Sequence, residues 1–173
     1  MSHLGLQLLY GDFNQMPNVY CERAFAPWPD MEQKLRENHI PLYTLETFTP
    51  IREMDFVAFT LQYEMSFTNI LNMLDLAGIP LYAADRGDND PLIIAGGPTA
   101  SNPEVLAPFI DFFYIGEGEV SYHEIFNRYE AHKAAGGHRR DFLSKILDLG
   151  PIYVPAYYDV EYYDTPAAGA QYT

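Results

Sequence analysis

Two adjacent glycines at the end of an apolar run are the first residues of this sequence that could serve chemistry. Gly96 and Gly97 carry no side chain, so a large ligand could approach the backbone closely there. Hydroxyl groups that could bond such a ligand follow directly. The candidate binding residues of this turn are Gly96, Gly97, Pro98, Thr99 and Ser101. An ordinary turn, in which glycine supplies a positive φ and a proline opens the next helix, explains the same residues.

A second glycine turn follows another apolar run and precedes a helical pattern. Its residues are Gly116, Glu117, Gly118 and Glu119. Helix N-termini attract anions, but the two glutamates would repel a phosphate and could instead stabilise the helix dipole. A hydrolase built on this carboxylate pair is a weaker interpretation, because acids at a helix start are commonly structural. Neither turn matches GxGxxG or a P-loop, so those motifs give no support for nucleotide binding.

Histidine and cysteine do not form a metal-ligand pattern in this sequence. None of the five histidines has ligand spacing to another histidine or to cysteine. The single cysteine, Cys21, excludes an internal disulfide and cannot by itself hold an iron–sulfur cluster. We therefore expect no metal site in this chain.

The elements that must position these turns alternate between strand and helix. Strands are predicted at 19–25, 42–48, 56–60, 92–95 and 112–115. Helices are predicted at 4–11, from Met31 to Asn38 with Asp30 as cap, from Ser66 or Thr68 to Gly78, at 104–109, from Tyr122 and at 140–147. The first helix should be buried on most sides. The strand at 56–60, Phe-Val-Ala-Phe-Thr, is apolar on both faces, as a central parallel strand should be.

This alternation predicts an α/β fold with a flavodoxin-like, Rossmann-like, doubly wound and mostly parallel sheet. We expect one α/β domain over 1–150 and an extended, tyrosine-rich tail over 151–173. Ligands of such sheets bind beyond the carboxyl ends of the strands. The loop at 60–65 and both glycine turns lie at that edge in the predicted topology.

Composition limits the classes of partner. The chain has 173 residues, 24 acidic and 10 basic, with a formal charge of −14, and 48% of its residues are hydrophobic. A nucleic-acid backbone would be repelled by this charge. No apolar stretch is long enough to span a membrane and the N-terminus lacks a signal-peptide pattern, so we expect a cytoplasmic protein without nucleic-acid or membrane partners.

Several segments, in order, resemble one family. They are MSHLGLQ (1–7), VYCERAFAPWPDM (19–31), LQYE (61–64), NMLDLAGIPL (72–81), AGGP (95–98) and IGEGE (115–119). Together they resemble the N-terminal cobalamin-binding-like domain of radical S-adenosylmethionine (SAM) proteins, in a group of large uncharacterised members. The resemblance covers nearly the whole chain.

The resemblance implies a flavodoxin-like sheet whose strand-end loops face a cobalamin. The two glycine turns would hold its tail or corrin edge, with Thr60, Leu61, Gln62 and Tyr63 near the same face. A separate catalytic domain, carrying CxxxCxxC for a 4Fe-4S cluster that cleaves SAM, is the implied partner. This chain lacks those cysteines, and it also lacks the DxHxxG motif that gives cobalt a histidine ligand. By itself it is therefore expected to be non-catalytic.

Relatives resemble this chain but begin with an additional strand before the segment that matches 1–7. In a doubly wound sheet that strand is central, so its absence would leave two neighbours unpaired. We expect those neighbours either to pair directly or to borrow a strand, with residues 152–163 of this or another chain as the candidate. A homo-oligomer through unpaired strand edges is a related expectation, and a mis-assigned start or a fragment would explain the gap.

The leading interpretation is a non-catalytic cofactor-binding module of a radical SAM protein. The alternative is a scaffolding domain that binds no cofactor and docks on the catalytic domain through its aromatic tail. A stand-alone enzyme would need an acid–base or nucleophile set that the sequence does not offer.

Overall fold

The centre of the fold is a sheet made from the most apolar runs of the sequence. The computed structural model describes residues 4–117 and 121–159. Four strands pair in the order β1-β2-β3-β4. They are β1 (Phe56–Thr60), β2 (Leu92–Gly96), β3 (Phe112–Tyr114) and β4 (Ile152–Tyr153). The first three are parallel and β4 is antiparallel to β3, which confirms the mostly parallel α/β sheet.

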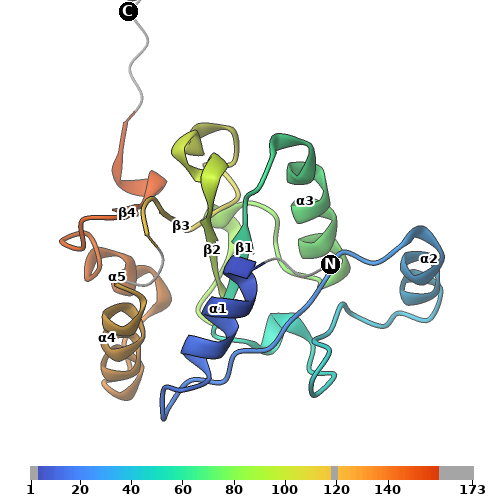
Figure 1. Ribbon diagram of the computed structural model, residues 1–173, viewed down its shortest axis with the longest axis horizontal. Coiled ribbons are helices and arrows are strands. Elements are labelled where there is room, and N and C mark those ends of the chain that lie inside the picture. The colour runs from blue at the N-terminus through green and yellow to red at the C-terminus, as the bar shows by residue number, and fades with distance from the viewer. Residues whose placement is uncertain (1–3, 118–120, 160–173) are drawn as a thin grey trace, which may run out of the picture.

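Helices cover both faces of this sheet (Figure 1). Alternate residues of β2 point to opposite faces, as the strand geometry requires. Ile93 packs in the core that contains α3 (Phe67–Leu76). Leu92 and Ile94 pack in the core that contains α4 (Tyr122–Ala134) and α5 (Arg139–Ser144). The result is the three-layer arrangement expected of a flavodoxin-like fold.

Helix α3 has the boundaries that its sequence pattern predicts. Ile70 and Leu74 are buried at helical spacing, and Gly78 follows the helix with φ 66°. Ser66 occupies the N-cap position, but its hydroxyl donates to the carbonyl of Tyr63 and accepts no capping hydrogen bond from a helix N–H.

Helix α1 (Leu4–Phe13) forms as predicted but is not buried on most sides. Phe13 is its only buried residue, while Leu4 and Leu8 are 68% and 53% exposed. Phe13 packs edge-on against the rings of Tyr122 and Phe126 in α4. The helix is therefore attached mainly by its C-terminal end.

Helix α2 (Pro29–Glu37) begins earlier than predicted. Trp28 stands at the N-cap and Pro29 at the first helical position, where a missing N–H has no cost. Asp30 is therefore inside the first turn and is not the cap. The helix ends before Asn38, as predicted.

Two predicted strands do not form. In the segment 19–25, the backbone N–H of Cys21 is taken by the Asn14 side chain and that of Arg23 by the Glu46 carboxylate. In the segment 42–48, only Tyr43 forms an isolated bridge, with Pro50. In 19–25, side chains satisfy donors that a ladder would have used. In 42–48, the N–H groups of Leu42, Thr44 and Leu45 instead donate to the backbone carbonyls of Leu76, Thr49 and Arg23.

The remaining short elements are 3₁₀ turns. They are η1 (Ile51–Glu53), η2 (Glu64–Ser66), η3 (Ala83–Asp85), η4 (Pro98–Ser101), η5 (Pro103–Val105) and η6 (Pro155–Tyr157). η5 occupies part of the segment predicted as a helix at 104–109. α5 begins at Arg139 and ends at Ser144, shorter than predicted.

Strand β4 joins the sheet beside β3, at the edge opposite β1. The expectation that Ile152 and Tyr153 would fill a gap beside a central strand is therefore wrong for these residues, while 160–163 lie outside the described residues. Direct pairing is also not observed, because β1 pairs only with β2 in the described part of the chain. None of the helices within residues 4–117 and 121–159 is long and apolar enough to cross a membrane.

Candidate functional site

The carboxyl ends of β1, β2 and β3 meet at one edge of the sheet because these strands are parallel. In the register of neighbouring strands, Thr60 of β1 pairs with Gly96 of β2, and Gly96 pairs with Tyr114 of β3. The three turns selected from the sequence therefore lie next to one another. Their proximity follows from topology alone.

Backbone hydrogen bonds join the loop after β1 to the turn that contains Gly96 and Gly97. The N–H of Leu61 donates to the carbonyl of Gly96 at 2.6 Å, and the carbonyl of Leu61 accepts from the N–H of Thr99 at 3.1 Å. Gly97 has φ 103°, and a Cβ atom there would lie 2.9 Å from the Leu61 carbonyl oxygen. The space beside Gly97 is thus filled by the protein's own backbone on this side.

Most polar side chains of these two loops have partners within the chain. The amide nitrogen of Gln62 donates to the Thr60 hydroxyl at 2.7 Å, and the Ser101 hydroxyl donates to the Pro98 carbonyl at 3.1 Å. The Thr99 hydroxyl differs, because its oxygen is buried and has no hydrogen-bond partner in the described structure.

The third turn is held by an aromatic hydroxyl. Tyr114 donates to the carbonyl of Glu117 at 2.9 Å and accepts from the N–H of Ser121 at 3.2 Å. Gly116 is exposed, with φ 152°. Gly118 and Glu119 lie outside the described residues.

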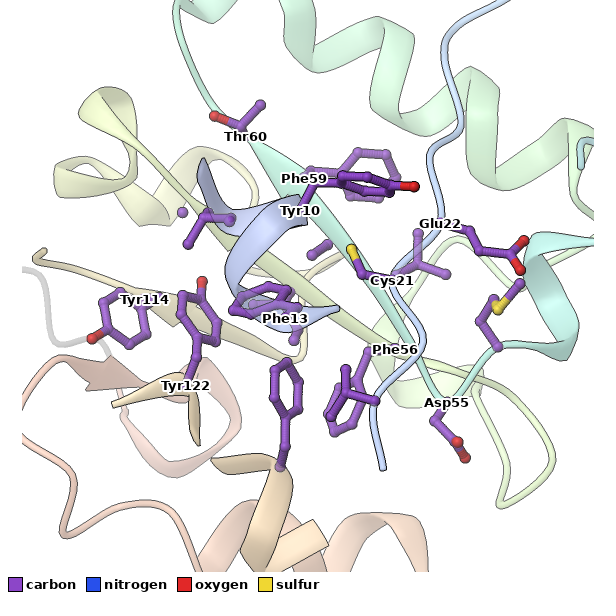
Figure 2. Close-up of a pocket in the computed structure, with 18 of the residues that line it drawn as sticks. Tyr10, Phe13, Cys21, Glu22, Asp55, Phe56, Phe59, Thr60, Tyr114 and Tyr122 are labelled. Carbon is purple, nitrogen blue, oxygen red and sulfur yellow. The ribbon is translucent and has the colours of Figure 1, made fainter. Parts of the chain in front are cut away.

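A cavity of about 870 Å³ opens at this edge and continues along β1. Figure 2 shows Phe56 and Phe59 of β1 on one side of it, with Tyr10 and Phe13 of α1 and Cys21 around it. Its volume lies in the range of ligand pockets, about 300–1,000 Å³. The predicted site residues that line it are Thr60, Gln62, Gly96, Gly97, Pro98, Gly116 and Glu117. Leu61, Tyr63, Thr99 and Ser101 do not line it; Leu61 is fully buried and Tyr63 is 57% exposed.

Titratable groups around the cavity are perturbed mainly by burial. Burial, together with the carboxylates of Glu46 and Glu22, raises the pKa of the Cys21 thiol. Burial likewise raises the pKa of the Tyr122 hydroxyl. Both groups are therefore held in their neutral forms, and Cys21 is not an activated nucleophile.

Three of the described histidines make side-chain contacts within the chain, and no described histidine lines the cavity. His123 contacts Asp12, His132 contacts the carbonyl of His138, and His138 contacts Asp88. No group of three or more metal-ligating side chains that could hold a metal ion exists among the described residues. At this edge the cavity is bordered by the Gln62 amide and the Thr60 hydroxyl, which bond each other, and by backbone at Gly97 and Gly116.

The second wall of the cavity lies outside the residues that the sequence predicts for the site. This wall consists of α1 and the segment 16–24, which contributes Val19, Cys21 and Ala24. The available signal is the strand that the sequence predicts at 19–25. The segment instead lies outside the sheet and lines the cavity.

Comparison with known proteins gives a family match over most of the chain. A family model described as "Radical SAM proteins, N-terminal" matches residues 5–155. An uncharacterized protein of Methanocaldococcus jannaschii is 32% identical over 91 residues, which are 51% of this chain and 18% of that protein. The chain therefore matches less than a fifth of the length of this relative. No solved structure matches the chain.

Proposed function

Because the chain belongs to the family of N-terminal domains of radical SAM proteins, we propose that it is a non-catalytic module that holds a large cofactor for a radical SAM protein. Cobalamin is the cofactor in this proposal, and the partner is the catalytic domain that carries the iron–sulfur cluster and SAM. The proposal includes a cytoplasmic location, in keeping with a single unpaired cysteine.

One observation carries the proposal most directly. The cavity opens where the carboxyl ends of three parallel strands meet, which is the usual ligand position in such sheets. Thr60 and Gln62 border it from one loop, and Gly97 and Gly116 border it from the other two turns. A cofactor at this edge would contact backbone at the glycines and side-chain oxygen and nitrogen at Thr60 and Gln62.

In this proposal, the Gln62 amide and the Thr60 hydroxyl would form hydrogen bonds with cobalamin. Amide and hydroxyl groups can bond the amide arms of a corrin, so Gln62 and Thr60 would hold the corrin edge. The described residues at this edge provide no histidine, so the cobalt would take no histidine ligand from them. The cofactor would supply organometallic chemistry to the partner domain, while this chain would bind and orient it.

Titration with hydroxocobalamin, followed by desalting and an absorption spectrum, tests the proposal. The chain should retain about one cobalamin per molecule, and Gln62→Ala should weaken retention by about tenfold, the equivalent of one good hydrogen bond. Gln33→Ala, in exposed α2, is the matched control and should bind as the parent chain does. A colourless protein after desalting would contradict the proposal and favour a domain that docks on its partner without a cofactor.

A further inference from the structure

Strand β1 has the sequence of a central strand but lies at an edge of the observed sheet. Both faces of Phe56–Thr60 are apolar, yet none of its five residues is buried. The neighbouring β2 has four buried residues out of five. No lysine, proline or bulge protects this edge, although exposed edges are normally protected in such ways.

Backbone hydrogen bonds to β2 alternate along β1, and this alternation shows which backbone groups of β1 have no partner among the described residues. The carbonyl of Asp55 accepts from Leu92, and the N–H of Leu61 donates to Gly96, so the odd-numbered residues face β2. The N–H and C=O groups of Phe56, Ala58 and Thr60 therefore point away from β2. In the described part of the chain, no hydrogen bond reaches these groups.

The cavity lies beside this free edge of β1, where a further strand of the sheet would be added. It continues along β1 and is lined from both layers of the fold. Ile51 and Met73 belong to the α3-side core, whereas Phe13 belongs to the α4-side core. A ligand bound on one face of the sheet would not contact both cores, but a strand in the plane of the sheet would.

The segment 16–24 forms the far wall and does not fill this position. Backbone groups of Cys21 and Arg23 bond elsewhere: Asn14 bonds both the N–H and the carbonyl of Cys21, and the Arg23 carbonyl accepts from the N–H of Leu45. Figure 2 shows Cys21 and Glu22 on a segment that runs beside β1 without joining it.

We propose that the free edge of β1 receives an extended polypeptide strand, uncharged and apolar on both faces, which runs parallel to β1 and extends the sheet. A lipid or aliphatic ligand would fill the apolar space but leave the alternate backbone groups unpaired, which is costly when they are buried. The added strand would continue the β1–β2 ladder. Polypeptide beyond the matched region is present in the archaeal relative, of which the match covers 18%.

A peptide-binding experiment tests this inference independently of any cofactor. The probe is a fluorescein-labelled peptide with a Val-Ile-Val-Ala-Val core between lysine pairs, and the readout is fluorescence anisotropy. It should bind saturably. Methylation of alternate core amides leaves one hydrogen-bonding edge and should be tolerated, whereas methylation of every core amide should abolish binding without changing charge.

Ala58→Pro is the matching variant of the protein. It removes an N–H that faces the free edge and not β2, so the sheet should persist while peptide affinity falls by at least about tenfold. Ala58→Ser keeps the N–H and should bind as the parent chain does. Circular dichroism checks that both variants fold.

Three results would overturn the inference. The fully methylated peptide could bind as well as the unmodified one, or peptide affinity could be unchanged in a folded Ala58→Pro variant. Alternatively, sedimentation could show that the chain dimerises and that the dimer does not bind the peptide, which would assign the edge to a second copy.

Discussion

Gly97 lies so close to Leu61 that a Cβ atom at residue 97 would come within 2.9 Å of the Leu61 carbonyl oxygen. This approach locks the loop after β1 to the turn after β2, and two backbone hydrogen bonds between the segments accompany it. Glycine at this position therefore serves the contact between two loops of the candidate site.

Gly97→Ala should destabilise the domain by about 1–3 kcal/mol, because alanine is strained at φ 103° and collides with backbone. Gly11→Ala is the control, since Gly11 lies in helix α1 with nothing within 4 Å of a Cβ atom. It should stabilise slightly, because alanine favours helix. Urea denaturation measures both. Equal effects of the two substitutions would contradict the proposed contact.

Asp111→Asn should cause a larger loss of stability. The Asp111 carboxylate is 2% exposed and bonds Arg86, Arg139 and the N–H of Ile93 in β2. Losing its charge would leave two buried guanidinium groups uncompensated, at about 3–5 kcal/mol.

Asp148→Asn, which removes the exposed partner of Arg128, is the control for the buried pair and should change stability little. Thermal or urea unfolding distinguishes the two variants. If Asp111→Asn were as mild as Asp148→Asn, the buried charges would not depend on this carboxylate.

Thr99→Val should leave stability unchanged or raise it by up to about 1 kcal/mol, because it removes a buried hydroxyl that has no partner in the described structure. Thr44→Val is the control. The Thr44 hydroxyl is buried and accepts from the N–H of Thr49 at 3.1 Å, so its loss should cost about 1 kcal/mol. A clear destabilisation by Thr99→Val would mean that the hydroxyl has a partner in solution.

The His138–Asp88 pair should make stability depend on pH. A hydrogen bond to Asp88, with the charges of Asp88 and Asp141, raises the pKa of His138 above its ordinary 6.5. Its stabilisation is complete below 6.5 and disappears as pH rises through the raised pKa. The hydrogen bonds from His138 and from the Arg139 N–H lower the pKa of Asp88, so its contribution disappears only as pH falls through that lowered value.

His138→Gln should therefore cost more stability at about pH 5 than at about pH 8. Nuclear magnetic resonance titration of the histidine ring checks the cause directly, and Asp88→Asn should return the pKa of His138 toward 6.5. A ring that titrates at the same pH in both proteins would exclude Asp88 as the partner.

The predicted strands that form in the structure are those whose apolar runs end in glycine or in a short loop. Phe56–Thr60, Leu92–Gly96 and Phe112–Tyr114 were all predicted from such runs. The segment 19–25 is less apolar, because it includes Glu22 and Arg23, and two of its backbone donors bond the side chains of Asn14 and Glu46. Local pattern cannot show such competition.

Part of the candidate site could be predicted from the topology of the sheet. Parallel topology brings Thr60, Gly96 and Gly116 to one edge, and that topology follows from the strand–helix alternation. The internal partners of Gln62 and Ser101 depend on loop conformation, and the cavity wall from α1 depends on tertiary packing. Neither has a signature in residue type or spacing.

Hydrogen–deuterium exchange with and without hydroxocobalamin tests the central proposal most directly, because it locates a ligand as well as detecting one. Added cobalamin should slow exchange in peptides that cover residues 60–63, 96–101 and 116–117, and should leave α2 unchanged. Exchange that is unchanged at all three turns, at concentrations of cobalamin that saturate any binding, would contradict the assignment of this edge as the cofactor site.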